Sequence, residues 1–335
     1  MMKIYFLTFI SSIFILTSFA QDLHLSQFYT ADHMLNPAKV GAHDGQYRVS
    51  ANMRNQWRQF GRPINTNVIA ADNTFNYYSH SMDGGVMFAR DEFSRFGQVV
   101  TEIHATAAYE YPIDDHIFRI GIQPGLVLRQ TDLSKQTFPE QWNYLEGTFD
   151  QSWSNQETNI APSLAHFDLN MGVMWSNSLT DKLNISAGVA FNHLNRPKNS
   201  YFDEHTERLK VRSVIHTEVD YVLNHLITIS PKLLFMATTK TNETLIGSNV
   251  SYKLPSDKFT RAFAGMYYRH GIIREFDALY PIVGLTYGQF DFGFSYDFNM
   301  SEISTFGAKG TYEFSLVYTA PNFKPRFKTL PCERF

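Results

Sequence analysis

Asp114, Asp115 and His116 are consecutive, and a carboxylate beside an imidazole could work as a general acid and base. The three residues follow Pro112 between two apolar alternating stretches, where a short turn is expected. Aspartate is an ordinary turn residue because its side chain bonds to nearby backbone amides. We therefore interpret this group as a turn rather than as a catalytic pair.

His216, Glu218 and Asp220 lie at every second position, so a strand would present all three on one face. That placement would suit a metal site or a proton relay, since imidazole and carboxylate groups serve both. The same pattern is also expected of polar residues that line an aqueous channel. We favour the polar lining.

The sequence lacks the spacings that usually carry enzymatic or metal chemistry. Its 12 histidines contain no His-x-x-x-His pair, and no Gly-Lys-Ser/Thr phosphate loop or Gly-x-Ser-x-Gly elbow occurs. Cys332 is the one cysteine, so it is either a free thiol or paired with another chain. A hydrolase would also need a nucleophile that converges with a general base, and we find none in this sequence. We predict that the protein is not an enzyme and needs no cofactor or metal.

Side chains such as His216 and Glu218 would be positioned by β-strands, and the strand pattern of this chain is clearest in residues 290–298. Every even-numbered residue there is aromatic, and every odd-numbered one is Asp, Gly or Ser. This alternation predicts a strand with two unlike faces. Lipid suits the aromatic face and a wet lumen suits the polar face, and only a closed barrel leaves no backbone edge in hydrocarbon. We predict an all-β transmembrane antiparallel barrel in contact with outer-membrane lipids.

Similar alternation recurs along the chain and predicts about fourteen strands, an even number as in bacterial single-chain barrels. Connections after even-numbered strands are short, whereas most others are longer, led by 131–164 and 195–210. This asymmetry is typical of periplasmic turns and external loops. Pro124 lies within a strand and predicts a bulge. The strands are expected near 46–53, 68–78, 86–90, 99–111, 117–129, 167–175, 183–191, 215–223, 227–235, 243–254, 259–268, 278–287, 290–298 and 310–318.

The chain divides into four expected segments. Residues 1–20 have the basic start, apolar run and small final residues of a signal peptide, which we expect to be cleaved after Ala20. Residues 21–44 form a lead-in that either stays in the periplasm or folds into the barrel mouth. The barrel covers 45–319. Residues 320–335 contain three prolines and form a basic periplasmic tail, either free or docked on a partner.

Charge points to no particular ligand. Removing Lys3 with the signal peptide leaves 28 basic and 32 acidic residues, a net charge of −4, and there is no basic stripe for nucleic acid. The expected lumen carries both signs, so a strong ion preference is not indicated. A general diffusion porin or solute channel remains an alternative to a binding protein, depending on whether 21–44 or 131–164 obstructs the bore.

Several short motifs lie near both ends of the mature chain, namely Gln27-Phe28-Tyr29, Asn36-Pro37-Ala38 with Gly41, Asn55-Gln56-Trp57, Gly84-Gly85 and Cys332 with Arg334-Phe335. In this order they resemble the PorP/SprF family of type IX secretion outer-membrane proteins from Bacteroidetes. The resemblance implies a non-enzymatic barrel that works with periplasmic and outer-membrane components of the secretion and gliding machinery. It also implies that the barrel helps large adhesins or other cargo reach the cell surface. The motif residues, which are the candidates for partner binding, are Gln27, Phe28, Tyr29, Asn36, Pro37, Ala38, Gly41, Asn55, Gln56, Trp57, Gly84, Gly85, Cys332, Arg334 and Phe335.

Overall fold

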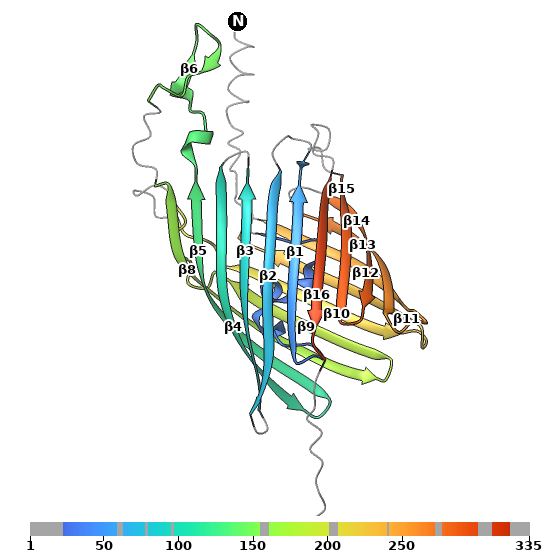
Figure 1. Cartoon of the computed structure of the whole chain (residues 1–335). Coiled ribbons are helices and arrows are strands. Elements are labelled where there is room, and N and C mark those ends of the chain that lie inside the picture. The colour runs from blue at the N-terminus through green and yellow to red at the C-terminus, as the bar shows by residue number, and fades with distance from the viewer. Residues whose placement is uncertain are drawn as a thin grey trace, which may run out of the picture.

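The strands form one closed antiparallel barrel (Figure 1). The structure is a computed structural model, and it describes residues 23–58, 63–77, 80–94, 97–154, 161–200, 207–239, 241–271, 277–300 and 310–321. Within those residues the barrel has fourteen strands, as the sequence predicts. They are β1 (Tyr47–Gln56), β2 (Ile64–Tyr77), β3 (His80–Phe93), β4 (Gln98–Ile113), β5 (His116–Thr131), β8 (Ser163–Thr180), β9 (Leu183–Asn192), β10 (Arg212–Val222), β11 (Ile227–Ala237), β12 (Asn242–Lys253), β13 (Phe259–His270), β14 (Ala278–Tyr287), β15 (Phe290–Asn299) and β16 (Thr311–Thr319).

Each barrel strand pairs with the strands that flank it in the chain, and β1 also pairs with β16 to close the sheet. Closure satisfies the backbone groups that would otherwise remain at two open edges in lipid. We call the β1–β16 pair the seam. Across it, Arg54 faces Glu313 and Asn52 faces Ser315.

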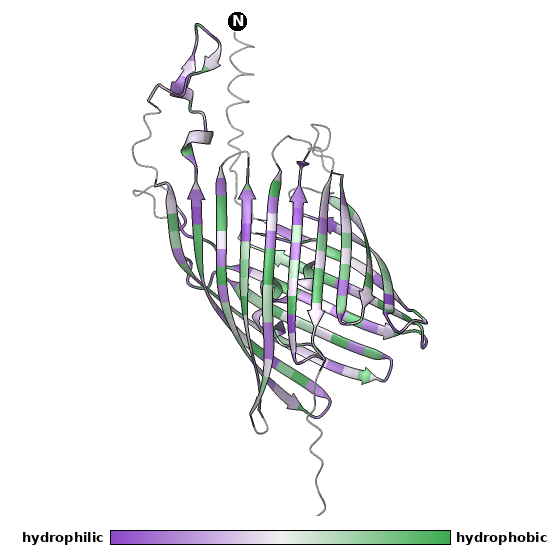
Figure 2. Cartoon of the chain, in the orientation of Figure 1, coloured by the Kyte–Doolittle hydropathy of each residue, from purple (hydrophilic) through white to green (hydrophobic). Residues whose placement is uncertain are grey.

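The two faces of β15 differ as predicted. Phe292 and Phe294 are 46% and 37% exposed, whereas Ser295 and Asp297 are buried inside the barrel. Figure 2 shows the resulting bands of apolar and polar residues along the barrel wall. This arrangement confirms the expected apolar outer face.

The two ends of the barrel are unlike. One end carries the connections 132–162 and 193–211, and we call it the long-loop end; the short-turn end carries 114–115 and 288–289. The longest connection holds a small hairpin of β6 (Trp142–Asn143) and β7 (Thr148–Phe149), which projects beyond the barrel in Figure 1. The loop asymmetry that the sequence predicts is therefore present.

The bulge predicted at Pro124 is wrong. The β4–β5 pairing keeps one register on both sides of this residue, with His104 opposite Gly125 and Ala107 opposite Ile122. Proline lacks an N–H and so omits a ladder bond, but no extra residue is inserted into the strand. Register shifts occur instead near Thr180 and near Arg261.

The expected signal peptide and most of the expected tail lie outside the described residues. Among the residues that are described, no helix is long and apolar enough to cross a bilayer.

A charge on the lipid face should destabilise the barrel. We expect Phe294→Arg to lower the free energy of unfolding by about 2–4 kcal/mol, because a cation near the middle of a spanning strand must leave water. Gln289→Arg, in a short turn of the same hairpin, should cost at most about 1 kcal/mol. Denaturant unfolding of the barrel in lipid vesicles measures both. Equal losses for the two variants would contradict the assignment of Phe294 to lipid.

Candidate functional site

Most of residues 23–46 lies inside the barrel, and we call this segment the plug (Figure 1). It contains three short helical turns: η1 (Phe28–Thr30), α2 (Asp32–Leu35) and η2 (Pro37–Lys39). The last turn is defined locally, because the Asn36 carboxamide oxygen accepts a hydrogen bond of 2.8 Å from the Ala38 amide and Pro37 takes the first helical position. Of the two positions that the sequence left open for this lead-in, the described part occupies the lumen.

The plug extends along most of the lumen. Ser26 contacts Glu313 at the start of β16, which is the long-loop end of the barrel. Gly41 donates a backbone hydrogen bond of 2.8 Å to Asp72, near the short-turn end of β2. A single segment therefore links the two ends of the bore.

Apolar contacts hold the plug against two parts of the wall. Phe28 and Leu35 belong to one buried cluster, and Leu25 and Ala31 belong to another. The lumen face is thus not uniformly polar, contrary to the expected wet lining. Burial of apolar side chains stabilises the plug in its seat by about 25 cal/mol for each Å² removed from water. The wall residues are Ala190, Val214, Leu234, Leu245, Tyr267, Tyr280 and Ile282 in the first cluster, and Val68, Ala70, Met87 and Ala89 in the second.

Carboxylates at the seam and on the adjoining strand β15 bind the start of the plug. The backbone amides of Ser26 and Gln27 each donate a 2.8 Å hydrogen bond to Glu313, and the Ser26 hydroxyl donates to Asp297 at 2.7 Å. Arg54 lies 3.2 Å from both carboxylates, and Arg269 pairs with Asp297 as well. We call Ser26, Arg54, Arg269, Asp297 and Glu313 the seam cluster. Breaking such a buried cluster by removing one partner typically costs about 3–5 kcal/mol.

A second ionic network fixes the middle of the plug. Lys39 lies 3.1 Å from Asp32 and also pairs with Glu218 on β10, which accepts a 2.6 Å bond from Lys232. Asp32 in turn pairs with Arg48 on β1. Charges on the plug are therefore matched by charges on opposite parts of the wall.

Glycines on neighbouring strands let the plug backbone touch the wall. Gly121 on β5 faces Gly172 on β8. A Cβ at Gly121 would overlap the Pro37 carbonyl, and one at Gly172 would overlap the Asn36 side chain. Asn36 uses this close approach to donate a 3.0 Å bond to the Val173 carbonyl. Arg119, two residues before Gly121, donates to the Ala38 carbonyl at 3.0 Å.

The candidate residues of the plug are brought together with the wall. Gln27 bonds to the side chains of Ser295 and Ser315, and the Tyr29 ring stacks on Tyr267 at 6.1 Å. Gly41 has a φ of +77°, which suits glycine, and is packed on Asp83. All of the plug candidates contact the lumen wall: Gln27, Phe28, Tyr29, Asn36, Pro37, Ala38 and Gly41.

The other candidates are dispersed. Asn55, Gln56 and Trp57 lie at the long-loop end of β1, where Asn55 bonds to Asn65 and Trp57 donates its amide to Gly310 at 3.3 Å. Gly85 lies under the His33 ring of the plug, whereas the nearest side chain to Gly84 is that of Phe75. Cys332, Arg334 and Phe335 lie outside the described residues.

The residues that suggested chemistry do not form one site. His216 contacts Asn36 at 3.0 Å, Glu218 pairs with lysines, and Asp220 accepts a bond from Ser230. Asp114 occupies a turn with a φ of +51°, and His116 bonds to Trp175. No group of three or more potential metal ligands occurs among the described residues. The arrangement supports polar lining and plug binding.

Sequence reasoning missed the wall residues that bind the plug, although a signal existed. Glycine within an otherwise alternating strand often marks a close backbone approach, and Gly121 and Gly172 are such residues. Asp297 and Glu313 are recognisable as inward-facing, but their contact with Ser26 is not encoded by any local spacing.

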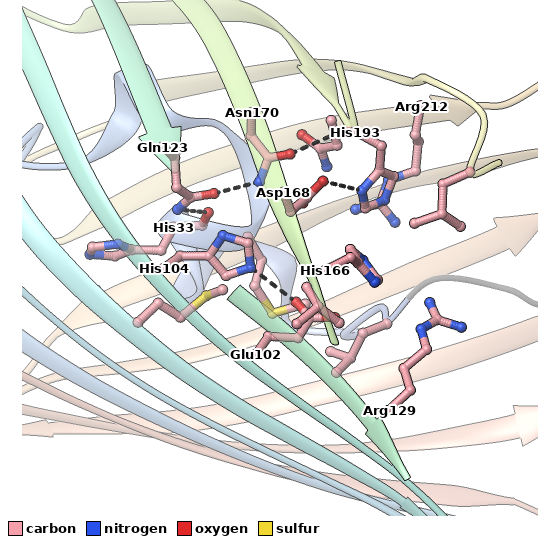
Figure 3. A pocket seen from close by; sticks show the side chains of 16 residues that line it. His33, Glu102, His104, Gln123, Arg129, His166, Asp168, Asn170, His193 and Arg212 are labelled. Atoms are coloured by element: carbon pink, nitrogen blue, oxygen red, sulfur yellow. Dashed lines mark hydrogen bonds and ion pairs between the residues drawn. The ribbon is translucent and has the colours of Figure 1, made fainter. Parts of the chain in front are cut away.

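A cavity lies between the plug and the wall near the long-loop end (Figure 3). The Gln123 carboxamide forms part of its lining and donates a hydrogen bond of 3.0 Å to the His33 carbonyl of the plug. Two carboxylates in the cavity are paired with imidazoles: Asp168 with His193 at 2.9 Å, and Glu102 with His104 at 3.3 Å. The cavity is therefore a polar space bounded on one side by the plug.

The closed barrel and its internal plug define a membrane β-barrel with an occupied lumen. The chain belongs to the family described as type IX secretion system membrane protein PorP/SprF, whose model matches residues 17–318. This match confirms the resemblance drawn from the motifs. It makes the chain a membrane component of the type IX secretion class, and with the barrel it points to the outer membrane.

Two solved barrels are similar in fold. A Pseudomonas aeruginosa FadL homologue has 11% identity and a TM-score of 0.51, covering 87% of this chain and 94% of its own. The monoaromatic hydrocarbon channel CymD has 9% identity and a TM-score of 0.51, covering 88% and 93%. At such identities the likeness shows the barrel fold alone. No curated protein matches the sequence.

Filling the glycine contact should release the plug. We expect Gly121→Ala to raise hydrogen exchange of residues 23–46 by about tenfold or more, because the added methyl group displaces the Pro37 backbone. Gly84→Ala, on the outer face of β3, should leave that exchange unchanged, since Gly84 does not contact the plug. Exchange measured by mass spectrometry compares the two. Unchanged plug protection in Gly121→Ala would refute the proposed seating.

Proposed function

We propose that this protein serves type IX secretion as a non-enzymatic outer-membrane barrel that binds machinery and cargo. Its role is to aid secretion or surface display of cargo such as large adhesins. The observation that carries the proposal is the plug, because a lumen filled by the chain itself suits a binding scaffold better than a diffusion pore. The family match supports the same class of role.

The contacts of the plug support permanent rather than loose occupation of the bore. The seam cluster holds one end, the Lys39 network holds the middle, and Gly41 is hydrogen-bonded to Asp72 at the other. A solute would have to break several buried ion pairs to pass, each of which is costly to disrupt. A general diffusion porin is therefore the weaker hypothesis.

Two surfaces are left for partners. The long-loop end presents the β6–β7 hairpin, on which Tyr144 and Leu145 are 87% and 97% exposed. The basic residues of 320–335 offer a periplasmic contact on the proposed orientation of the chain. We assign cargo to the first end and periplasmic components of the machinery to the second.

Conductance separates a binding scaffold from a pore. In planar bilayers the mature barrel should conduct poorly, and deleting residues 23–43 should raise conductance by about tenfold or more, because a barrel of this size without internal filling leaves an aqueous channel. Replacing Trp142–Phe149 by a Gly-Ser linker is the matched control, since that hairpin lies outside the lumen. A large, steady conductance of the intact protein would overturn the proposal.

Deletion tests the periplasmic contact. Removing residues 321–335 should abolish co-purification with components of the secretion machinery and leave a barrel whose mobility in SDS gels still depends on heating. The physical reason is that these residues supply the basic groups of the proposed contact. Replacing Trp142–Phe149 should leave that co-purification intact. If the truncated protein still binds the machinery, the tail has no docking role.

A further inference from the structure

Side-chain nitrogens of two residues that line the cavity of Figure 3 have no hydrogen-bond partner within the described part of the chain. The Arg129 Nε and both ring nitrogens of His166 are buried and have no hydrogen-bond partner among the described residues. Buried polar atoms in folded proteins are nearly always paired. Arg129 supplies N–H donors and the His166 ring supplies one more, so the two residues together suggest an acceptor that binds there.

The register places these donors on one wall. Arg129 on β5 faces Leu164 on β8, and Val127 faces His166. Arg129 and His166 are therefore diagonal neighbours on the lumen face of adjacent strands, close enough to bind one small group together. Figure 3 shows both side chains on the same side of the cavity.

The acidic residues of the cavity have imidazole partners. Asp168 is 2.9 Å from His193, and Glu102 is 3.3 Å from His104. The His104 ring fits beside β5 because Gly125 has no side chain, and a Cβ there would overlap the ring. Within the described part of the chain, both acids are thus already paired, and neither accepts a hydrogen bond from the Arg129 Nε or from His166.

The size and lining of the cavity limit the ligand. Its volume is about 40 Å³, and a single water needs about 10–15 Å³, so the carboxylate and the next carbon of a ligand fit inside and the rest of a short chain extends through the opening. Leu23 and Met34 from the plug, with Met87 and Val127 from the wall, form an apolar side. A guanidinium pairs well with the planar oxygens of a carboxylate, and the apolar side suits a short alkyl chain.

We propose that this cavity is a binding site for a short-chain carboxylate, held by Arg129 and His166 and reached from the long-loop end. The site lies between the plug and β5–β8, so its ligand would contact both. This proposal goes beyond the role in secretion and depends on the isolated barrel alone.

Binding of butyrate to the detergent-solubilised mature barrel tests the site. Saturation-transfer NMR should detect bound butyrate, and calorimetric titration should give an affinity that falls by about tenfold or more in Arg129→Gln and in His166→Leu, since each removes a charge-assisted or imidazole donor. Arg261→Gln is the matched control, because Arg261 is paired with Asp291 on another part of the wall. It should bind butyrate as the unmodified protein does. Heat-dependent gel mobility verifies that each variant is folded.

Two competing solutes test which feature of butyrate the site recognises. Butyramide has the same shape without the charge and should not displace butyrate, and chloride at equal concentration should displace it poorly. Equal competition by butyramide would mean that the apolar side alone carries binding, which would overturn the carboxylate site. Equal competition by chloride would overturn the assignment to a carboxylate. Unchanged affinity in both cavity variants would overturn the location.

Discussion

The seam cluster couples closure of the barrel to seating of the plug. Arg54 and Glu313 face each other across the first and last strands, so this buried pair forms only when the barrel closes. The same carboxylate accepts the backbone amides of Ser26 and Gln27. Closure of the sheet and seating of the plug therefore share one group of charges. Neither can be lost without leaving buried charge unpaired, which is strongly destabilising.

The wall meets a different solvent on each side. Outside, aromatic and aliphatic side chains such as Phe292 and Ile120 are exposed to the bilayer. Inside, apolar residues such as Leu234 and Leu245 would be poorly solvated in an open channel, and the plug covers them with Phe28 and Leu35. The plug is thus part of the core, in the sense that its removal would expose apolar surface as well as charges.

Backbone contact explains why several motif residues lie in the plug. Asn36 caps the turn that follows it and also reaches the Val173 carbonyl, while Pro37 starts that turn. Gly121 and Gly172 leave room for both. A motif of small and turn-forming residues on one segment is therefore matched by glycines on the wall. These motif residues therefore hold the plug in place, which agrees with the proposed binding role.

Alternation along the chain was enough to predict the strands, their number and the unlike ends of the barrel. A period of two is a local property, because each residue and its neighbours decide which side faces lipid. Residues 290–298 illustrate this, since their aromatic positions are the exposed ones. The same local reading failed at Pro124, where the pairing of the neighbouring strand kept the register.

The position of the plug and the contacts that hold it come from long-range contacts and not from local sequence pattern. Arg54 and Glu313 are 259 residues apart in the sequence, and Asn36 and Val173 are 137 apart. Contacts at such separations follow from the register of every intervening strand and from closure of the sheet. The paired acids of the cavity and its unpaired donors arise in the same way, from three strands and a plug that no local pattern brings together. Local alternation therefore sets which face of each strand meets lipid, and closure of the sheet sets what the other face encloses.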